Sequence, residues 1–381
     1  MSLPKSGSVV LFRRGDTFYG EFAPPFGCEV GAYGTGARPI ITLYKLLNRA
    51  EGWKEHSPGI WKIDVGSPET HDGYTASSDA NIGYLVVDGV VKPARKLVLF
   101  DLEKPWDFYC DLEQNALYVV SPTNPTDLAT QIQAAPNGDA YGPTGRVIYC
   151  AKGSNDIHDV HVTGSGGCGI GGTAPDVHIH NCLIDYIGGS ILLDGRHRRY
   201  GNAIENWVGV KRWLIENNEI AQVYDAAFSP QGYAGATGSW EDLTVRNNYI
   251  HDCSQTFEFW SAGSRTAGGY KRILIEGNHC ERGGYSVFSD VRPDQNVRVH
   301  LNTYALETPA DIIIQNNVFE DAYSAYSYHA AEPEGYVSRN NIVRLRPGQK
   351  MQFQRPETVE DAASWQAATG REVGSTITVM L

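Results

Sequence analysis

Short apolar strands in this chain end repeatedly on the same polar residue. Five such segments close on Asn: Leu214 to Asn218, Thr244 to Asn248, Leu274 to Asn278, Ile313 to Asn317 and Val337 to Asn341. The final Asn recurs at intervals of 30, 30, 39 and 24 residues, which indicates one structural unit repeated with loops of different length. A single strand cannot bury its apolar face alone, so the units must stack on one another. The pattern predicts an all-β parallel β-helix.

Two inward-facing rows follow from this alignment, because side chains alternate between the faces of a strand. The row three residues before the Asn contains Ile179, Ile215, Val245, Ile275 and Ile314. The row two residues after it contains Ile184, Ile220, Ile250, Cys280 and Phe319. We expect the Asn amides to hydrogen-bond from coil to coil at one corner, at about 4.8 Å per coil, since Asn also tolerates left-handed turns. Cys182 takes the Asn position in the coil before Asn218.

The same patterning divides the chain into four parts. Alternating strands rich in tryptophan, with a hairpin turn at Asp111 to Asn115, interrupt the coils and predict an antiparallel module. A helix is expected from Thr358 to Thr369, with Trp365 anchoring it over the last coil. The predicted parts are opening β-helix coils over residues 1–42, an inserted antiparallel β-module over 43–143, the main parallel β-helix over 144–345 and a C-terminal cap over 346–381.

The next strand of each coil carries the candidate chemistry. Its first residue is apolar in every coil and faces inward, so the second and fourth residues face outward. One predicted outward row is Glu205, Phe228, Glu258, Phe288 and Ser327, and the row beside it is Trp207, Pro230, Trp260, Asp290 and His329. The segment Ser190 to Asp194 competes with Ile204 to Trp207 for the first of these strands. The similarity of I-E-x-W to F-E-x-W favours Ile204 to Trp207 and makes residues 195–201 an inserted loop.

Exposed tryptophans beside carboxylates on a rigid sheet favour sugar recognition, since an indole ring stacks on the apolar face of a sugar. We predict Glu258, Glu205, Asp225 and Asp290 as the catalytic set. Strand geometry predicts Cα separations of about 8 Å for Glu258 and Asp290 and about 10 Å for Glu205 and Glu258. An inverting glycosidase needs its carboxyl groups about 6.5 to 9.5 Å apart, so an inverting geometry is favoured over a retaining one.

Each of these assignments has a structural alternative. An outward Glu on a β-helix is often part of a charged surface, and Asp225 could cap the turn before its strand. Trp207 and Trp260 could pack beneath the loops at residues 232–240 and 261–270. Gln231 and His300 are further substrate-binding candidates. The basic run that ends at Arg199 is expected to project over the same face, where guanidinium groups could bind carboxylates or sulfates.

Closely spaced acidic and histidine residues resemble metal-ligand spacings. They lie in two segments, Asp156 to His161 and Asp176 to His180. His178 and His180 are expected to face solvent, with His161 beside His178. No geometry for a third ligand is evident from the sequence, so we predict no metal site there.

The composition narrows the class of partner. The net charge of -12 argues against nucleic acid, since phosphate binding needs a basic face, and no segment has the roughly 18 apolar residues of a membrane span. The seven cysteines form no CxxC pair and are expected to be buried thiols. The N-terminal segment has no apolar stretch of signal-peptide length and indicates a trimmed start or a start within a coil, so secretion is neither indicated nor excluded.

Several sequence motifs, in the order in which they occur along the chain, resemble those of carbohydrate-active, right-handed parallel β-helix proteins of the pectin-lyase-like superfamily. They are RRGDTFYG, YGTGARP, RYGNAIENW, VYDAAFSPQG, FEFW, RPD and WQAATG. The resemblance implies a right-handed, single-stranded parallel β-helix with an antiparallel insertion, and roles in the site for Arg199, Asn202, Glu205, Asp225, Glu258, Trp260, Arg292 and Asp294. The segment Phe288 to Val291 departs from the group's usual aromatic and His-containing sequence before RPD.

The leading hypothesis is a glycoside hydrolase that acts on an extended polysaccharide or oligosaccharide and needs no cofactor. The close alternative is a polysaccharide lyase or epimerase, with a base such as Arg, Lys or His, for which Arg199 and Arg292 are candidates, and with Ca²⁺ held by carboxylates to neutralise a uronate. A third is a non-catalytic, glycan-binding or phage-tail-like β-helix. We expect no nucleic-acid or membrane partner and a location outside the cell, at its surface or in the periplasm; the sugar, the linkage and the oligomeric state stay open.

Overall fold

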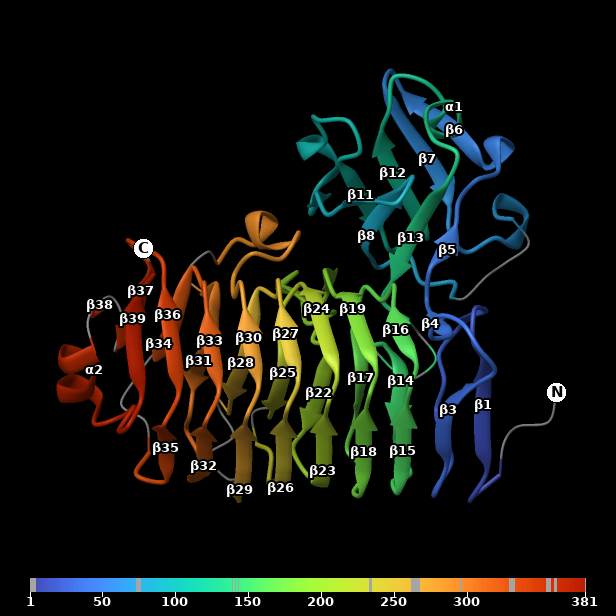
Figure 1. Ribbon diagram of the computed structural model, residues 1–381. Helices are drawn as coiled ribbons and strands as arrows, with labels where there is room; N and C mark the ends of the chain where they lie inside the picture. The colour runs from blue at the N-terminus through green and yellow to red at the C-terminus, as the bar shows by residue number, and fades with distance from the viewer. Residues whose placement is uncertain are drawn as a thin grey trace.

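Three long parallel sheets wrap around one interior, and a separate antiparallel module stands on one edge of the coil (Figure 1). The computed structural model describes residues 5–72, 77–138, 140, 142, 144–232, 235–261, 268–294, 297–328, 333–353, 358–359 and 362–380. Each regular coil contributes one strand to sheet A, then one to sheet B, then one to sheet C. The predicted all-β, right-handed parallel β-helix with an antiparallel insertion is confirmed.

The strands of the three sheets are given in spatial order. Sheet A contains β1 (Val9–Arg13), β3 (Glu29–Tyr33), β15 (Asn155–His158), β18 (Val177–His180), β23 (Lys211–Glu216), β26 (Ser239–Arg246), β29 (Gly269–Glu276), β32 (Ala310–Gln315) and β35 (Tyr336–Arg339). Sheet B contains β2 (Thr17–Tyr19), β4 (Ile40–Thr42), β16 (His161–Thr163), β19 (Leu183–Ile187), β24 (Glu219–Val223), β27 (Tyr249–His251), β30 (His279–Glu281), β33 (Val318–Glu320), β36 (Ile342–Leu345) and β39 (Thr376–Val379). Sheet C contains β14 (Arg146–Cys150), β17 (Cys168–Gly172), β22 (Ile204–Trp207), β25 (Ala226–Gln231), β28 (Gln255–Trp260), β31 (Val299–Ala305), β34 (Ser324–Tyr328), β37 (Lys350–Phe353) and β38 (Thr358–Val359).

An asparagine ladder joins the coils at the corner between sheets A and B, as predicted. Each Asn amide donates to the Oδ1 of the next, at 3.0 Å from Asn218 to Asn248 and 2.9 Å from Asn248 to Asn278. The ladder continues through Asn317 to Asn341. The left-handed conformation belongs to the residue before each ladder position, as in Asn217 with φ 56°. The two residues of each Asn-Asn pair therefore have different roles: the first adopts the left-handed turn, and the second forms the hydrogen bonds of the ladder.

Both predicted inward rows lie in the core. The row from Ile179 to Ile314 and the row from Ile184 to Phe319 pair strand to strand in the predicted register and are fully buried. The backbone N–H of Cys182 donates to Asn218 Oδ1 at 2.9 Å, so Cys182 does precede Asn218 at the corner. All seven cysteines are buried free thiols, as expected.

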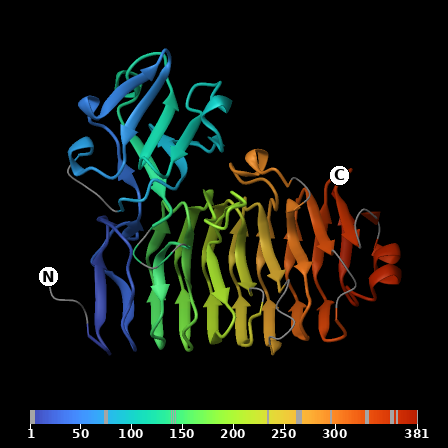
Figure 2. The same ribbon diagram turned by 180° about the vertical axis from the view of Figure 1, so that it is seen from behind.

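The inserted module leaves the coil after β4 and returns to it at β14. Its two sheets consist of β10 (Arg95–Lys96), β11 (Phe108–Asp111), β12 (Ala116–Val120), β7 (Ile60–Asp64) and β6 (Trp53–Ser57), and of β5 (Lys45–Leu46), β13 (Ile132–Pro136), β8 (Ile82–Val87) and β9 (Val90–Lys92). Short helices η1 (Ala50–Gly52), η2 (Pro68–Thr70), η3 (Leu99–Asp101) and α1 (Pro125–Leu128) lie in its loops. β11 and β12 form the hairpin predicted around Asp111 to Asn115. Figure 2 shows from behind that the module rises beside the N-terminal half of the coil.

The register of sheet C corrects two of the predicted outward positions. Ile204 pairs with Phe228, and Phe228 pairs with Phe257, so Phe228 faces inward and is fully buried. The two small alanines at the start of β25, residues 226 and 227, occupy the corner and shift the strand by one residue. Pro230 therefore leaves the outward row, and Gln231 pairs with both Trp207 and Trp260.

The predicted outward positions Phe288 and Asp290 do not lie on sheet C, because another segment forms the strand of that coil. Phe257 pairs with Leu301 and Glu258 pairs with Asn302, so β31 is the sheet C strand that follows β28. The segment from Val287 to Asp290 lies instead in the loop after β30, around η4 (Ser289–Val291). Phe288 is buried against the module, where its ring lies 5.1 Å from that of Tyr84. Ser327 keeps its predicted outward row, paired with Asn302, and His329 lies outside the described residues.

Two other predictions concern the choice of the first sheet C strand in the site region and the C-terminal helix. Ile204–Trp207 does form the sheet C strand, and β20 (Ser190–Ile191) pairs with β21 (Arg199–Tyr200) as a hairpin at the rim. The C-terminal helix α2 (Ala362–Thr369) begins later than predicted, because β38 occupies residues 358–359. Trp365 of α2 is fully buried against Tyr326 and Tyr328. No helix in the described ranges is long and apolar enough to cross a membrane.

Candidate functional site

Glu258 lies on sheet C in a nearly closed polar environment. It belongs to β28, its residue is 7% exposed, and two side chains of the preceding coil donate to its Oε2. Ser229 Oγ is 3.1 Å away and Gln231 Nε2 is 2.9 Å away. No described residue makes a hydrogen bond to Oε1. Oε1 is therefore the oxygen that can carry a proton toward a ligand.

The charge state of Glu258 is set by burial and by Asp225. Burial raises the pKa of Glu258 to about 8, and the negative charge of nearby Asp225 adds to the rise. Arg292 and the bonds from Ser229 and Gln231 act in the opposite direction but do not cancel it. Glu258 is consequently a neutral carboxylic acid near neutral pH, which is the state required of a proton donor.

Asp225 forms an ion pair with Arg292. It lies directly before β25, at the corner after β24, and its Oδ1 accepts from Gln255 Nε2 at 2.6 Å and from Arg292 at 2.9 Å. Arg292 comes from the loop after η4 and forms a two-bonded pair with Asp294 at 3.1 and 3.0 Å. Burial opposes the charge on Arg292, but Asp225, Tyr224 and Asp294 together raise its pKa above the ordinary value. Among the described residues, both side-chain bonds to Asp225 end on Oδ1, which leaves Oδ2 as the oxygen available to a ligand.

Glu205 occupies the same outward row as Glu258, two coils earlier, but has a different partner. Glu205 pairs with Ser229 across the sheet, and Ser229 lies between the two acids. Arg146 lies 3.1 Å from Glu205 Oε2, and both side chains are at most 4% exposed. The position that pairs with Glu205 on β17 is Gly171, where an added Cβ would lie 3.1 Å from Arg146 Nε. Glycine there leaves room for the guanidinium to reach the carboxylate.

The tryptophan row runs beside these acids. Trp207 pairs with Gln231, which pairs with Trp260, so the two indoles lie two coils apart with Gln231 between them. That separation corresponds to about 10 Å along the coil axis. All three side chains are half-buried. Trp260 lies two residues from Glu258 on the same strand, which places an aromatic ring next to the neutral acid on the same face.

Arg199 holds the module against the coil instead of projecting over the site. Its guanidinium donates to the carbonyls of Gly189, Gly83 and Pro93, at 2.7 to 3.2 Å. Two guanidinium groups lie over the Tyr224 ring, that of Arg199 at 4.6 Å and that of Arg292 at 5.0 Å from its centroid. Burial lowers the pKa of Arg199 to about 10. The predicted projection of Arg199 is wrong, because two carbonyls of the module, at Gly83 and Pro93, and one of the coil, at Gly189, bind it.

Three other predicted residues lie away from this cluster. Asp290 sits on η4 with its side chain 88% exposed and pairs with Arg298 at 3.1 Å. His300 is fully buried between Thr256 and the Glu320 carbonyl, and burial lowers its pKa to about 4. Asn202 is buried and accepts from the backbone N–H of Ala226. His300 and Asn202 therefore support the coil and do not reach its outer face.

Four residues of the site were not predicted. They are Tyr224, Ser229, Gln255 and Asn302: Ser229 bonds Glu258, and the other three bond Asp225 or one of its partners. Asn302 Nδ2 donates to Gln255 Oε1 at 2.6 Å, and Gln255 in turn donates to Asp225. The F-E-x-W and A-F-S-P-Q strands would have revealed Ser229 if Phe228 had been assigned to the inward row. Gln255 and Asn302 carry no such signal, because their partners come from strands 30 or more residues away.

Comparison with known proteins identifies the class. Residues 146–348 match the family described as "Right handed beta helix region". That match covers more than half of the chain, which therefore belongs to this family of right-handed β-helix proteins. A solved structure titled "Glycoside hydrolase" superimposes with a TM-score of 0.43 and 7% identity, over 98% of this chain and 89% of that chain. Similarity at this level does not define an activity. No curated protein matches the chain.

Proposed function

We propose that this protein is a glycoside hydrolase that cleaves an extended polysaccharide or oligosaccharide on the outer face of sheet C. The observation that carries the proposal is a buried Glu258, whose pKa burial and nearby Asp225 raise to about 8, beside an Asp225 that forms an ion pair with Arg292. Glycoside hydrolysis requires two carboxyl groups in opposite charge states, one to protonate the leaving oxygen and one to activate water or attack the sugar. The motif resemblance to carbohydrate-active β-helix proteins supports the same class.

In this proposal Glu258 is the general acid and Asp225 its ionised partner. Oε1 of Glu258 delivers the proton to the glycosidic oxygen, while Ser229 and Gln231 hold Oε2 in place. Asp225 activates a water through Oδ2, because Gln255 and Arg292 already occupy Oδ1. Loss of the leaving group and attack of water produce one new reducing end per bond cleaved. Asp225 replaces Asp290 and Glu205 as the partner acid expected from strand spacing.

The substrate would run along the coil axis, over the row of Trp207, Gln231 and Trp260. Aromatic rings about 10 Å apart can stack on separate sugar units of one chain. Arg292 is already paired with two aspartates, so it is poorly placed to bind an anionic sugar. Together with the net charge of -12, this favours a neutral glycan over a polyuronate.

Two observations weaken the lyase or epimerase alternative. The candidate arginine bases, Arg199 and Arg292, are both occupied by carbonyls or carboxylates, and the pKa of Arg292 is raised. The carboxylates proposed to hold Ca²⁺ do not form one group, because Asp290 lies on η4 and Asp225 is neutralised by Arg292. The non-catalytic, glycan-binding alternative uses the same tryptophans. A measurement of substrate turnover distinguishes it from the hydrolase.

The test is a panel of neutral and anionic polysaccharides, incubated with the wild-type protein and with Glu258→Gln. We expect new reducing ends from a neutral glycan with the wild type, no rise in absorbance from unsaturated products, and little release with Glu258→Gln. Unsaturated products, lost with EDTA and restored by Ca²⁺, would establish the lyase instead. Binding without release of reducing ends by either protein would establish a non-catalytic glycan-binding protein.

A further inference from the structure

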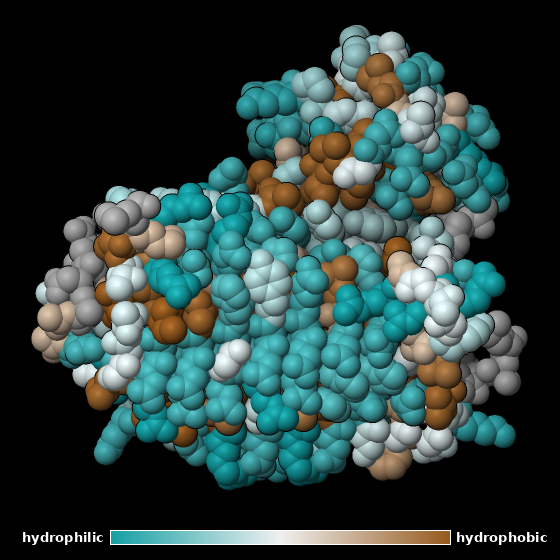
Figure 3. Space-filling view, in the orientation of Figure 1, coloured by the Kyte–Doolittle hydropathy of each residue, from teal (hydrophilic) through white to brown (hydrophobic). Residues whose placement is uncertain are grey.

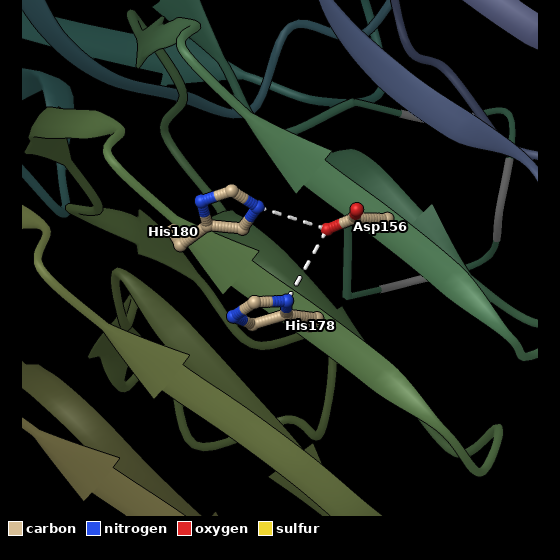
Figure 4. A group of neighbouring side chains, drawn as sticks. All are labelled: Asp156, His178 and His180. Carbon is tan, nitrogen blue, oxygen red and sulfur yellow. Dashed lines mark hydrogen bonds and ion pairs between the residues drawn. The ribbon is translucent and has the colours of Figure 1, made fainter.

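A second polar cluster lies on sheet A, separate from the acids of sheet C. His178 and His180 are two residues apart on β18 and share its outer face, and Asp156 of the neighbouring strand β15 pairs with His178. Figure 4 shows both imidazole rings turned toward one carboxylate oxygen of Asp156. One ligand atom from each residue lies within 4.8 Å of the other two. The structure thus supplies the third ligand that was not evident from the sequence.

The distances suit a tetrahedral cation. Asp156 Oδ1 is 3.1 Å from His180 Nε2 and 3.4 Å from His178 Nδ1. Ligands about 2.0 to 2.1 Å from a tetrahedral Zn²⁺ lie about 3.3 Å from one another. We propose that Asp156, His178 and His180 bind a divalent first-row transition cation of the zinc class, with solvent in the fourth position. The three side chains are 21 to 47% exposed, so a cation from solution can reach them.

Glu216 makes His178 a suitable ligand. Its Oε1 lies 3.1 Å from His178 Nε2, and Arg246 lies 2.7 Å from its Oε2. A ring N–H at Nε2 that donates to Glu216 leaves the Nδ1 lone pair facing Asp156 Oδ1. Two lone pairs in contact repel, so a cation or a proton must lie between them. A carboxylate that orients a ligating histidine through its other nitrogen is the usual outer partner of a zinc site.

His180 reaches the same state through Asn181. The Asn181 amide nitrogen, Nδ2, is the atom placed 3.0 Å from His180 Nδ1. Rotation of that amide by 180° presents its oxygen to an Nδ1–H, which leaves the Nε2 lone pair facing Asp156. The His158 ring stacks 5.1 Å from His180, but its nitrogens already contact Asp159 and Glu29. His158, not the predicted His161, is thus the histidine beside this cluster, because His161 lies on sheet B and bonds Asp185.

The donor set decides the kind of cation. Two imidazoles and one carboxylate suit Zn²⁺ and its neighbours in the first row, whereas Ca²⁺ and Mg²⁺ prefer oxygen ligands throughout. The cation would link the coils of β15 and β18 on a different sheet from Glu258. It is therefore expected to stabilise the coil, and this inference does not depend on the proposed hydrolase activity.

Equilibrium dialysis of the full chain against Zn²⁺, with the bound metal measured after removal of free ions, tests the proposal. We expect one equivalent bound by the wild type, loss of that equivalent in the His178→Ala, His180→Ala double variant, and weaker binding in Asp156→Asn. The matched control is His251→Ala with His279→Ala, since these histidines also contact carboxylates but lie on sheet B. Equal uptake by the wild type and the His178, His180 double variant would overturn the site.

Two further readouts guard against an unfolded variant. Substitution of Co²⁺ in the wild type should produce the visible absorption of a tetrahedral site, and Zn²⁺ should displace it while Ca²⁺ should not. Zn²⁺ should also raise the melting temperature of the wild type and of the His251, His279 control, and should raise that of Asp156→Asn by less. Absence of the tetrahedral spectrum, or an equal rise in Asp156→Asn, would contradict the assignment.

Discussion

Glu205 and Glu258 occupy one row of sheet C, two coils apart, and are 2% and 7% exposed. Glu205 faces the guanidinium of Arg146 across 3.1 Å. Glu258 faces Ser229 and Gln231, with a second carboxylate, Asp225, nearby. Burial is the main cause of the raised pKa of Glu258, and the charge of Asp225 adds to it. Glu205 is instead one half of a buried ion pair with Arg146.

The comparison shows how a repetitive fold can produce a single reactive position. Every coil presents equivalent positions, so the row alone does not distinguish a structural Glu from a catalytic one. The distinction comes from irregular segments: Arg292 and Asp294 lie in the loop after η4, and Asp225 lies at a corner. Figure 3 shows a flank of the coil that is largely hydrophilic, consistent with many charged residues that have structural roles.

The largest expected effect separates the two acids by activity. Glu258→Gln removes the proton donor but keeps the shape of the side chain, and we expect kcat to fall by at least about 100-fold, the lower end of general acid catalysis. Release of reducing ends from the cleaved glycan measures it. Glu205→Gln is the matched control, because it lies in the same row and is expected to retain kcat within about tenfold if folded. Equal losses in both variants would remove the distinction.

The second effect separates the acids by stability. Glu205→Gln leaves Arg146 buried without its counter-charge, and removal of one partner from a buried pair costs about 3 to 5 kcal/mol. Chemical denaturation measures the free energy of unfolding. The double variant Glu205→Gln with Arg146→Met should recover part of the loss, since no unpaired charge remains. A single variant as stable as the wild type would show that the pair contributes little.

A third expected effect concerns how stability depends on pH. Here the substitution Glu258→Gln should stabilise the protein, whereas Glu205→Gln should destabilise it. The pKa of Glu258 is raised from 4.5 to about 8, so between these values the folded chain holds a proton that the unfolded chain has released. Rising pH across this window therefore lowers stability through Glu258, and the penalty is complete above the folded value. Glu258→Gln has no titratable group at this position and so does not lose stability in this way. Its unfolding free energy should exceed that of the wild type by an amount that grows from pH 5 to pH 8, to the order of a few kcal/mol.

The smallest expected effect tests whether the tryptophan beside Glu258 binds sugar. Trp260→Ala should weaken binding of the cleaved glycan by about 1 to 3 kcal/mol, with little change in melting temperature, because the half-buried ring supports little of the core. Isothermal titration with the catalytically inactive Glu258→Gln background measures the affinity. A large fall in melting temperature with unchanged affinity would mean that the ring packs beneath a loop.

Much of the fold was predictable because the sequence repeat directly indicates which residues stack from coil to coil. The Asn ladder, both inward rows and the outward positions of Glu205 and Glu258 follow from aligning coils at Asn218, Asn248 and Asn278. A one-residue shift at Phe228 was not predictable from periodicity, because two alanines at a corner can face either way. The loop around Phe288 was assigned to a strand because its apolar residues pack on the module, a contact between residues far apart in sequence.

The partners of the site were less predictable than its acids. Glu258 and Asp225 were both candidates, but strand spacing favoured Asp290 or Glu205 as the partner of Glu258. Strand spacing describes residues within sheets and gives no position for a corner residue or a loop. The Arg199 contacts with the module carbonyls of Gly83 and Pro93 depend on how two parts of the chain pack together, which local patterns do not encode.

The central claim is that Glu258 is a neutral acid at neutral pH. Carbon-13 NMR of protein labelled at the glutamate side-chain carboxyl reports it directly, and comparison with Glu258→Gln assigns the resonance. We predict a carboxyl signal, missing from that variant, that titrates with a midpoint near the expected value of about 8. A midpoint near the ordinary value of 4.5 would contradict the account, because Glu258 would then be ionised and could not donate the proton.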